Sequence, residues 1–239
     1  MPALLDSYAA LLLDMHRTFM FGVDRFGPGE DFAATYREHG GARLAPAAVE
    51  AAVRGALALL AERYADPRRA GDAPSVDEAL RELAEVPASE RPRLVEVIAA
   101  HEHGTIPEDA RLAVLALCER RPVVVVSDLW APPRRWEETL RAAGIWPRLA
   151  AAVFSSEIGA VKPHPRPFEV ALARLGVAPG EALMIGDSYE RDVLGATALG
   201  VDAVWIDAAA SAGARPFAPA RAAVAHLAEV LTLRGPCVP

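Results

Sequence analysis

Five polar residues have the types and spacing of a ligand-binding or catalytic site. They lie in loops or just after apolar runs, and they are Asp14, Ser127, Lys162, Asp187 and Asp192. Carboxylates, a hydroxyl and an ammonium offer both anionic and cationic contacts, and open α/β sheets bind ligands just beyond the carboxyl ends of their strands. Each residue alone has a structural explanation, since an aspartate after a strand often caps a helix. Their combination, in this order along the chain, is more specific than any one of them.

Lys162 is also set apart by the composition of the chain. It is the only lysine among 25 basic residues, and the chain contains no asparagine and no glutamine. This pattern suits a GC-rich coding bias that replaces lysine with arginine wherever charge alone matters. Arginine does not replace lysine where a compact point charge is needed. We therefore expect Lys162 to be functional before any motif is considered.

The elements that must position these residues are short strands that alternate with helices. Continuous apolar runs predict buried parallel strands, and they cover residues 10–13, 123–126, 153–155, 183–185 and 203–206. Helical patterns lie between these runs at 107–120, 134–143, 167–175 and 190–199. Alternating strands and helices predict right-handed βαβ units. The expected fold class is therefore α/β, with a Rossmann-like, doubly wound parallel sheet.

Residues 21–104 differ from the rest of the chain because they contain few β-branched runs. Their alanine, leucine, glutamate and arginine content predicts helices at 31–39, 46–64, 75–84 and 91–101. We expect an all-helical domain over residues 21–104, inserted into an α/β core formed by 1–20 and 105–239. One further helix is predicted near 220–231, in a tail rich in alanine and proline.

Composition excludes several classes of protein. The chain has 239 residues, 52% of them hydrophobic, and a net charge of −7, which disfavours a nucleic-acid partner. No apolar run approaches the roughly 18 residues that a membrane-spanning helix needs, and the first residues lack the basic region of a secretory signal. Cys118 and Cys237 are too far apart in sequence to form a disulfide framework or a cysteine metal site. We expect a cytoplasmic protein.

The motifs around the five polar residues resemble those of the haloacid dehalogenase-like (HAD) hydrolase superfamily. The matching segments are LLLDMHRT at 11–18, VVSD at 125–128, GAVKPHP at 159–165 and MIGDSYERDVLGA at 184–196. The resemblance covers most of the chain outside the helical insertion, roughly 10–20 and 107–207. Within this family the insertion corresponds to a helical cap of the C1 type, placed between the first and second motifs.

The resemblance implies a role for each motif residue. Asp14 would be the nucleophile and would form an aspartyl-phosphate, with His16 and Lys162 as further catalytic residues. Mg²⁺ would be the cofactor, and its expected ligands are Asp14, the backbone carbonyl of His16, Asp187 and Asp192, the last through water or by orienting Lys162. Ser127, Asp128 and Lys162 would bind the phosphoryl group. The implied substrate is a small phosphorylated metabolite, and a homodimer is compatible with the resemblance.

The first motif departs from the family at two positions. His16 replaces the usual second aspartate, which protonates the leaving group and later activates water, and Arg17 replaces a small glycine. Three alternatives follow. His16 could be a substitute acid/base, since imidazole titrates near neutrality. The reaction could need no such acid, as in haloacid dehalogenases, although those relatives use an asparagine-bearing pocket that this chain lacks. Alternatively, the protein could have lost catalysis and bind a phosphorylated ligand or a protein partner.

Of the three alternatives, the sequence favours a Mg²⁺-dependent phosphatase. Asp14, Ser127, Lys162 and Asp187 are all retained, and a decayed site would have no need of its single lysine at the phosphate position. Phosphonate cleavage through a lysine of the cap is excluded, because residues 21–104 contain no lysine.

Overall fold

A six-stranded parallel sheet forms the centre of the α/β region. The computed structural model describes residues 3–209 and 219–234. The strand order is β3-β2-β1-β4-β5-β6, and every neighbouring pair is parallel. The strands are β1 (Ala10–Leu13), β2 (Val123–Ser127), β3 (Ala151–Phe154), β4 (Ala182–Gly186), β5 (Asp202–Ile206) and β6 (Ala222–Val224). The predicted α/β class and parallel sheet are confirmed.

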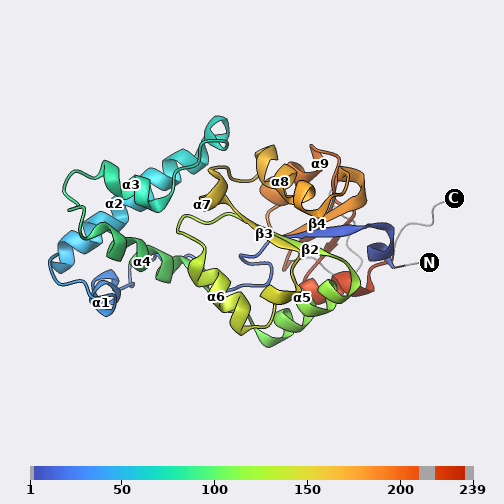
Figure 1. The fold of residues 1–239 in the computed structure, drawn as a ribbon, viewed down its shortest axis with the longest axis horizontal. Helices are drawn as coiled ribbons and strands as arrows, with labels where there is room; N and C mark the ends of the chain where they lie inside the picture. Colours follow the sequence, from blue (N-terminus) through green and yellow to red (C-terminus); the bar gives the residue numbers. More distant parts are fainter. Residues whose placement is uncertain (1–2, 210–218, 235–239) are drawn as a thin grey trace.

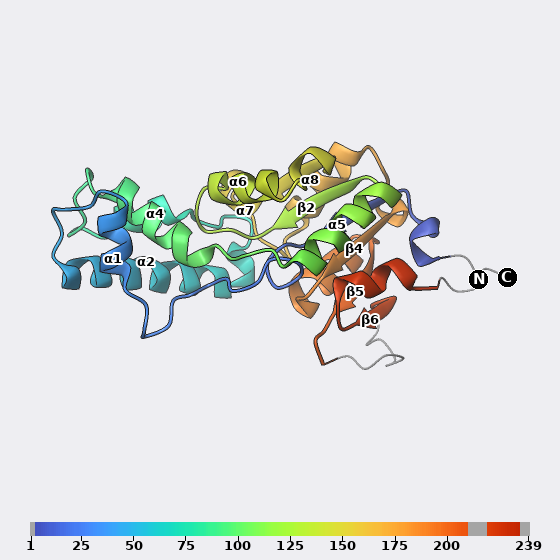
Figure 2. The same ribbon diagram turned by 90° about the horizontal axis from the view of Figure 1, so that it is seen from below.

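Alternate residues of the central strands face two different hydrophobic cores. Leu11 and Leu13 of β1 belong to one core, whereas Leu12 belongs to the other. The first core is covered by α5 (Glu108–Arg120) and α6 (Arg134–Ala142), and the second by α8 (Pro165–Leu175). Helices on both faces explain why the strands are apolar throughout rather than alternating. Figure 1 shows α5 and α6 on one side of the sheet and α8 on the other, and in Figure 2, seen from below, α5 lies in front of the strands.

Residues 32–102 form a helical region beside the sheet. Its helices are α1 (Phe32–Glu38), α2 (Pro46–Ala65), α3 (Val76–Glu82) and α4 (Arg91–Glu102). The long helix α2 contacts the other three. Local sequence explains where these helices begin, because Pro46 occupies the first turn of α2 and Ser75 forms a capping box with Glu78 at α3. All four helices were expected from the sequence, within a few residues at each end.

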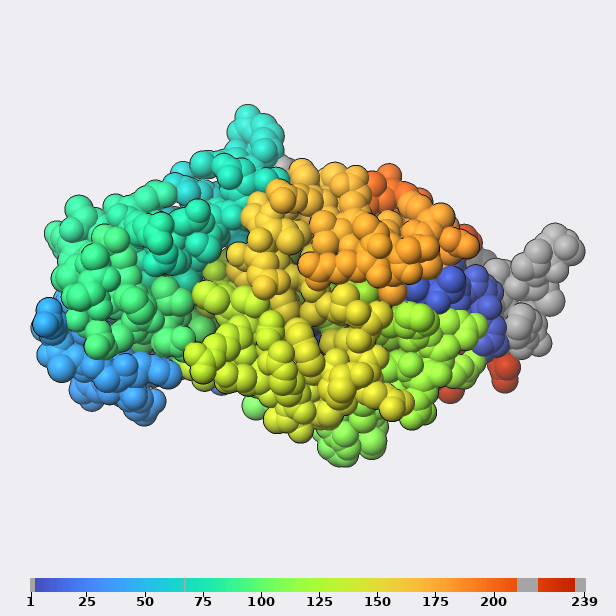
Figure 3. Space-filling model, viewed as in Figure 1, coloured from blue at the N-terminus to red at the C-terminus, as the bar shows by residue number. Residues whose placement is uncertain are grey.

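The helical region lies against the carboxyl end of the sheet (Figures 1 and 3). The segment between α2 and α3 contacts the loop that carries Lys162 through two backbone hydrogen bonds. Val161 N–H donates to Ala70 O at 2.8 Å, and Ala73 N–H donates to Gly159 O at 3.0 Å. The helices therefore lie over the strand ends at which the predicted site residues are found.

Two predictions at the carboxyl half of the chain need correction. No helix spans 220–231, because that segment forms β6 and then a 3₁₀-helix at Leu227–Thr232. The short apolar run at 222–224 pairs with β5 at the edge of the sheet, and this pairing overrides local helix propensity. The helix predicted at 190–199 begins as a π-helix at Tyr189–Leu194 and continues as α9 (Gly195–Thr197).

The remaining elements are short. They are α7 (Ser155–Ile158) and the 3₁₀-helices Leu4–Ser7, Pro67–Arg69, Trp146–Arg148 and Pro179–Glu181. In the described ranges, 3–209 and 219–234, no helix combines the length and hydropathy needed to cross a membrane. Cys118 is a free, half-buried thiol, and Cys237 lies outside the described residues.

Candidate active site

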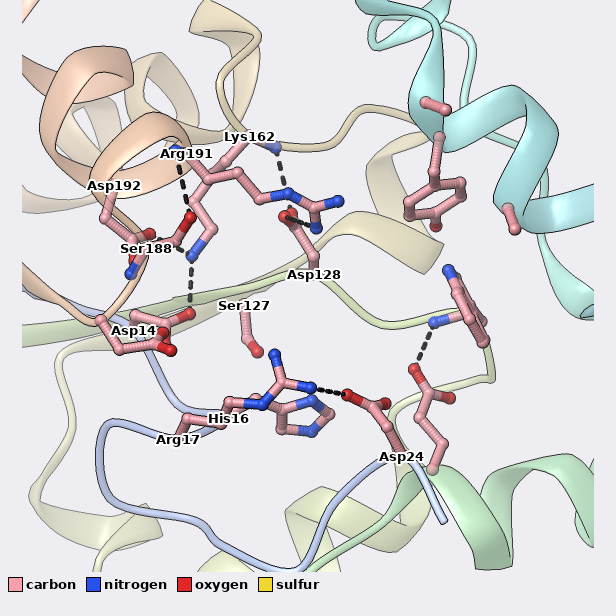
Figure 4. A pocket seen from close by; sticks show the side chains of 16 residues that line it. Asp14, His16, Arg17, Asp24, Ser127, Asp128, Lys162, Ser188, Arg191 and Asp192 are labelled. Carbon is pink, nitrogen blue, oxygen red and sulfur yellow. Dashed lines mark hydrogen bonds and ion pairs between the residues drawn. The ribbon is translucent and has the colours of Figure 1, made fainter. Parts of the chain in front are cut away.

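A cavity of about 550 Å³ lies at the carboxyl edge of the sheet, below the helical region. Its size is that of a pocket for a small molecule. All seven site residues that the sequence indicates line it, and Figure 4 labels each of them except Asp187; they are Asp14, His16, Ser127, Asp128, Lys162, Asp187 and Asp192. The structure therefore brings together residues that are up to 178 positions apart in the sequence. They meet because parallel strands β1, β2 and β4 end at the same edge.

Asp14 and Lys162 form a buried ion pair at the centre of this group. Lys162 Nζ donates to Asp14 Oδ1 and to Asp192 Oδ1, each at 2.6 Å, and the lysine side chain is 3% exposed. Thr18 Oγ1 donates to the other Asp14 oxygen at 2.8 Å. Burial alone would lower the pKa of Lys162, but the neighbouring carboxylates outweigh burial and raise it above its usual value. Lys162 therefore stays charged across the physiological range.

Asp187 and Asp192 complete a cluster of three carboxylates with Asp14. One oxygen of each lies within 4.8 Å of the others. Burial, reinforced by the Asp14 charge, raises the pKa of Asp187 to about 6. Burial also raises the pKa of Asp192 to about 7, although Lys162 opposes the shift. Glycine at 186 makes room for this arrangement, since a Cβ there would lie 2.3 Å from Asp192 Oδ2.

The three carboxylates fit a divalent cation. A single ammonium balances only part of their charge, and burial together with the Asp14 charge raises the pKa values of Asp187 and Asp192. Oxygen donors of this kind suit Mg²⁺, which prefers carboxylates and retained water to nitrogen or sulfur ligands. Among the residues that the structure describes, this is the one group of three that could hold a metal ion.

Ser127 ends β2, Asp128 follows it, and both line the cavity with Lys162. The Ser127 hydroxyl is buried, and its oxygen has no hydrogen-bond partner among the described residues. Such a buried polar atom is costly unless a ligand or water satisfies it. Asp128 is held by the protein itself, since it accepts a hydrogen bond from the Lys162 backbone N–H at 3.1 Å and pairs with Arg191 at 3.4 Å. Its carboxylate therefore fixes the Lys162 loop.

His16 has a partner that sequence patterns do not indicate. Trp136 Nε1 donates to His16 Nε2 at 2.9 Å, and the Trp136 ring is fully buried. Because this hydrogen bond occupies the Nε2 lone pair, we assign the ring proton to Nδ1. Burial lowers the pKa of His16 to about 4, with Asp14 opposing the shift. His16 is therefore a neutral imidazole whose accepting nitrogen is already engaged.

Several further residues of the cavity were not assigned to the site from the sequence. They are Arg17, Asp24, Tyr64, Glu102, Trp130 and Arg191. Arg191 lies inside the last motif and could have been found there. Tyr64 lies in α2 and Asp24 in the loop after β1, and no local pattern marks either of them. Their place in the cavity depends on how the helical region packs against the sheet.

Glu102, the last residue of α4, ties the helical region to the loop after β2. Its carboxylate accepts hydrogen bonds from Trp130 N–H at 2.7 Å and Ala131 N–H at 3.0 Å. Burial raises the pKa of Glu102 to about 8, although these two backbone donors lower it. The loop that follows Ser127 and Asp128 is therefore anchored by a residue of the helical region.

A family model described as a haloacid dehalogenase-like hydrolase matches residues 11–200. Over 150 residues the chain is 39% identical to a phosphoserine phosphatase of Thermus thermophilus. This aligned segment covers 63% of this chain and 53% of that protein. Over 74 residues it is 38% identical to a glyceraldehyde 3-phosphate phosphatase of Methanothermobacter thermautotrophicus, covering 31% of this chain and 32% of the relative. The chain thus matches about half of the length of the first relative and about a third of the length of the second.

Solved structures share the fold over nearly the whole chain. A HAD phosphatase from Thermococcus onnurineus superposes with a TM-score of 0.60 at 21% identity, covering 92% of this chain and 95% of that one. A 2-haloacid dehalogenase from Pseudomonas syringae gives 0.62 at 20% identity, covering 94% and 98%. At these identities the likeness establishes the fold and does not distinguish phosphatase from dehalogenase.

Proposed function

The chain belongs to the haloacid dehalogenase-like hydrolase family, and from this premise we propose that it is a Mg²⁺-dependent phosphatase of a small phosphorylated metabolite. One observation carries the proposal. Lys162 Nζ contacts Asp14 and Asp192 at 2.6 Å, in a cavity that also contains the unpartnered hydroxyl of Ser127. A carboxylate can attack phosphorus, and a fixed cation and a free hydroxyl can hold phosphoryl oxygens, so this set of groups suits phosphoryl transfer.

Asp14 is the proposed nucleophile. One of its carboxylate oxygens attacks phosphorus, and the bond from phosphorus to the ester oxygen breaks. That oxygen leaves with the electron pair and takes a proton from water, which gives the alcohol and a hydroxide ion. A second water then attacks the phosphorus of the aspartyl-phosphate, its oxygen stays on the released phosphate, its proton neutralises the hydroxide, and the carboxylate is restored. A carboxylate is a weak nucleophile, so its orientation matters. The contacts from Thr18 and Lys162, one to each Asp14 oxygen, supply that orientation.

Asp14, Asp187 and the backbone carbonyl of His16 are the proposed ligands of Mg²⁺. Asp192 is proposed to bind through water or to orient Lys162, and its direct contact with Lys162 Nζ supports the second role. When bound, the ion would offset the negative charge of the phosphoryl group. Lys162 and Ser127 would hold phosphoryl oxygens, whereas Asp128 would act through the Lys162 loop that it anchors.

His16 enters the proposal as a hydrogen-bond donor through Nδ1–H. A general base needs a free lone pair, and Trp136 occupies the one on Nε2. The same contact favours the alternative of a slow or catalytically inactive protein that binds a phosphorylated ligand or a protein partner. For His16 to carry a proton as acid/base, the Trp136 contact would have to break.

Residues 21–104 are proposed as a cap domain over a core formed by 1–20 and 105–239. The support is that α1–α4 pack together and that α2 contributes Tyr64 to the cavity. A cap in this place would exclude bulk water during attack by Asp14. The cytoplasmic location and the homodimer remain predictions.

The names of the relatives suggest where to look for the substrate. Both phosphatases act on small phosphorylated compounds, one of them on phosphoserine by its name. O-phosphoserine is therefore the first compound to test. A dehalogenase is disfavoured because the cavity retains a carboxylate cluster suited to a metal ion.

Phosphate release from a panel of phosphomonoesters, with MgCl₂ or with EDTA, tests the proposal. We expect turnover with Mg²⁺, loss of turnover with EDTA, and at least about a thousandfold loss in Asp14→Asn. Asp6→Asn is the matched control, because Asp6 is an exposed aspartate paired with Arg120 away from the cavity. Binding of phosphorylated compounds without turnover across the panel would favour the alternative. Equal rates with EDTA and with Mg²⁺ would contradict the proposed cofactor.

A further inference from the structure

Arg17 adopts a backbone conformation that a large L-residue rarely adopts. Its φ is +60°, in the left-handed region, and Asp24 in the same loop has a φ of +55°. Aspartate is enriched in this region, whereas an arginine is an outlier there, and glycine adopts it without steric cost. The chain therefore keeps an arginine where a glycine would be less strained.

The contacts of the Arg17 side chain do not offset this strain. Its guanidinium pairs with Asp24 at 2.8 Å, but the two side chains are 62% and 34% exposed, and exposed ion pairs contribute little to stability. The other contact of Arg17 is the backbone hydrogen bond from its N–H to Met20 O, which a glycine would keep. Backbone strain that the stability of the protein does not explain indicates that the strained residue has a role in function.

Arg17 is also the most accessible cation of the active-site cavity. Lys162 is buried, and Arg191 is 43% exposed and pairs with Asp128, whereas Arg17 is 62% exposed. In Figure 4 the Arg17 guanidinium lies between Ser127 and Asp24. It is thus within the same cavity as the nucleophile, and solvent or a ligand can reach it.

We propose that Arg17 binds a carboxylate of the substrate, so that the enzyme prefers phosphomonoesters that carry one. This inference rests on the proposed phosphatase function and specifies its substrate class. A guanidinium matches a carboxylate with two parallel hydrogen bonds. The Asp24 contact shows that a carboxylate oxygen fits against Arg17. A substrate carboxylate would either share the guanidinium with Asp24 or take the place of Asp24. Acidic side chains outnumber basic ones in the cavity, which favours a singly charged carboxylate over a second phosphate.

Two substrates that differ only in the carboxylate test the proposal. 3-Phosphoglycerate carries a carboxylate where glycerol 3-phosphate carries a hydroxymethyl group. We expect kcat/KM of the unmodified protein to favour 3-phosphoglycerate by at least about tenfold, and Arg17→Gly to lower this ratio by about 10- to 100-fold. The same substitution is expected to raise Tm by about 2–5 °C, because it relieves the left-handed strain.

Asp24→Gly is the matched control. It removes the same ion pair and also relieves a positive φ, but it keeps the guanidinium. We expect it to retain the preference for 3-phosphoglycerate. If both variants lower the ratio alike, the ion pair rather than Arg17 is responsible, and the proposal is wrong. A fall in Tm for Arg17→Gly would equally overturn the argument from strain.

Failure of the inference and failure of the proposed function are distinguishable. Calorimetry with the Asp14→Asn variant gives dissociation constants for the same two compounds without any turnover. Hydrolysis without a preference for 3-phosphoglycerate rejects the role of Arg17 alone. Preferential binding of 3-phosphoglycerate that disappears in the Asp14→Asn/Arg17→Gly variant, with no hydrolysis in the unmodified protein, supports Arg17 and rejects the phosphatase.

Discussion

Replacing Lys162 with methionine removes the ammonium from a buried cluster and leaves an unbranched side chain that is one atom shorter. Lys162 Nζ lies 2.6 Å from both Asp14 and Asp192, and the three side chains are between 1% and 7% exposed. The variant leaves two buried carboxylates facing each other, with Asp187 close by. We expect a large loss of stability together with the loss of activity.

The size of the loss follows from burial. Removing one partner of a buried ion pair costs about 3–5 kcal/mol, because the remaining charge is uncompensated. For a chain of this length, 1 kcal/mol corresponds to a Tm shift of about 2–4 °C, so Lys162→Met should lower Tm by about 6–20 °C at pH 8. Arg68→Met is the control, since it removes the cation of an exposed pair with Asp66 and should change stability by less than about 1 kcal/mol.

The loss should shrink as the pH falls. Burial already raises the pKa of Asp192 to about 7 while Lys162 opposes the shift, so removing Lys162 raises the pKa further. A carboxyl group with a higher pKa in the folded state than in the unfolded state destabilises the protein when it is ionised. This destabilisation is complete above the folded-state pKa and disappears as the pH falls to the unfolded-state pKa. The Tm deficit should therefore be smaller at pH 5 than at pH 8.

Differential scanning fluorimetry at pH 5 and pH 8, with and without MgCl₂, measures these effects. A Lys162→Met/Asp192→Asn double variant should recover part of the Tm at pH 8, because it removes the repulsion between carboxylates. Added MgCl₂ should also reduce the deficit at pH 8, since the folded state binds the cation. A deficit that is equal at both pH values and unchanged in the double variant would refute the electrostatic argument.

Three further predictions concern other groups of the site. Asp187→Asn should lower the affinity for Mg²⁺ at least about tenfold in calorimetric titrations, and an unchanged affinity would exclude Asp187 as a ligand. Trp136→Phe removes the N–H donor that favours neutral His16, so the pKa of His16 should rise from about 4 in an NMR titration. An unchanged value would show that burial and the neighbouring charges set the pKa without Trp136. Because burial raises the pKa of Glu102 to about 8, its ionisation should destabilise the fold progressively as the pH rises from about 4.5 to about 8, by up to about 5 kcal/mol, and urea denaturation should give a flatter pH profile for Glu102→Gln.

The central site residues were predictable because their positions depend on strand ends. Asp14, Ser127 and Asp187 each follow or end a continuous apolar run, and parallel strands place such residues at one edge. Lys162 was predictable from the composition of the chain and from its motif. The helices of residues 32–102 were also predictable, since their caps and loops carry local signals.

The rest of the site depends on tertiary packing that no local pattern encodes. Trp136 reaches His16 only because α6 packs against the first motif, and Tyr64 enters the cavity only because α2 lies over the sheet. The strained φ of Arg17 is set by the loop after β1, although its replacement of a glycine was visible in the sequence. The segment that forms edge strand β6 was predicted as a helix. Only three of its residues pair with β5, and so short an apolar run is a weaker sequence signal than the helix propensity of its neighbours.

Burial of the only lysine side chain has a consequence for the chemical modification of this protein. Lys162 is 3% exposed, so the surface offers no lysine amine to acetylating enzymes, to ubiquitin ligases or to amine-directed cross-linkers. Reagents of this kind should leave Lys162 unlabelled in the folded chain, and acylation of Lys162 would report that the fold had opened.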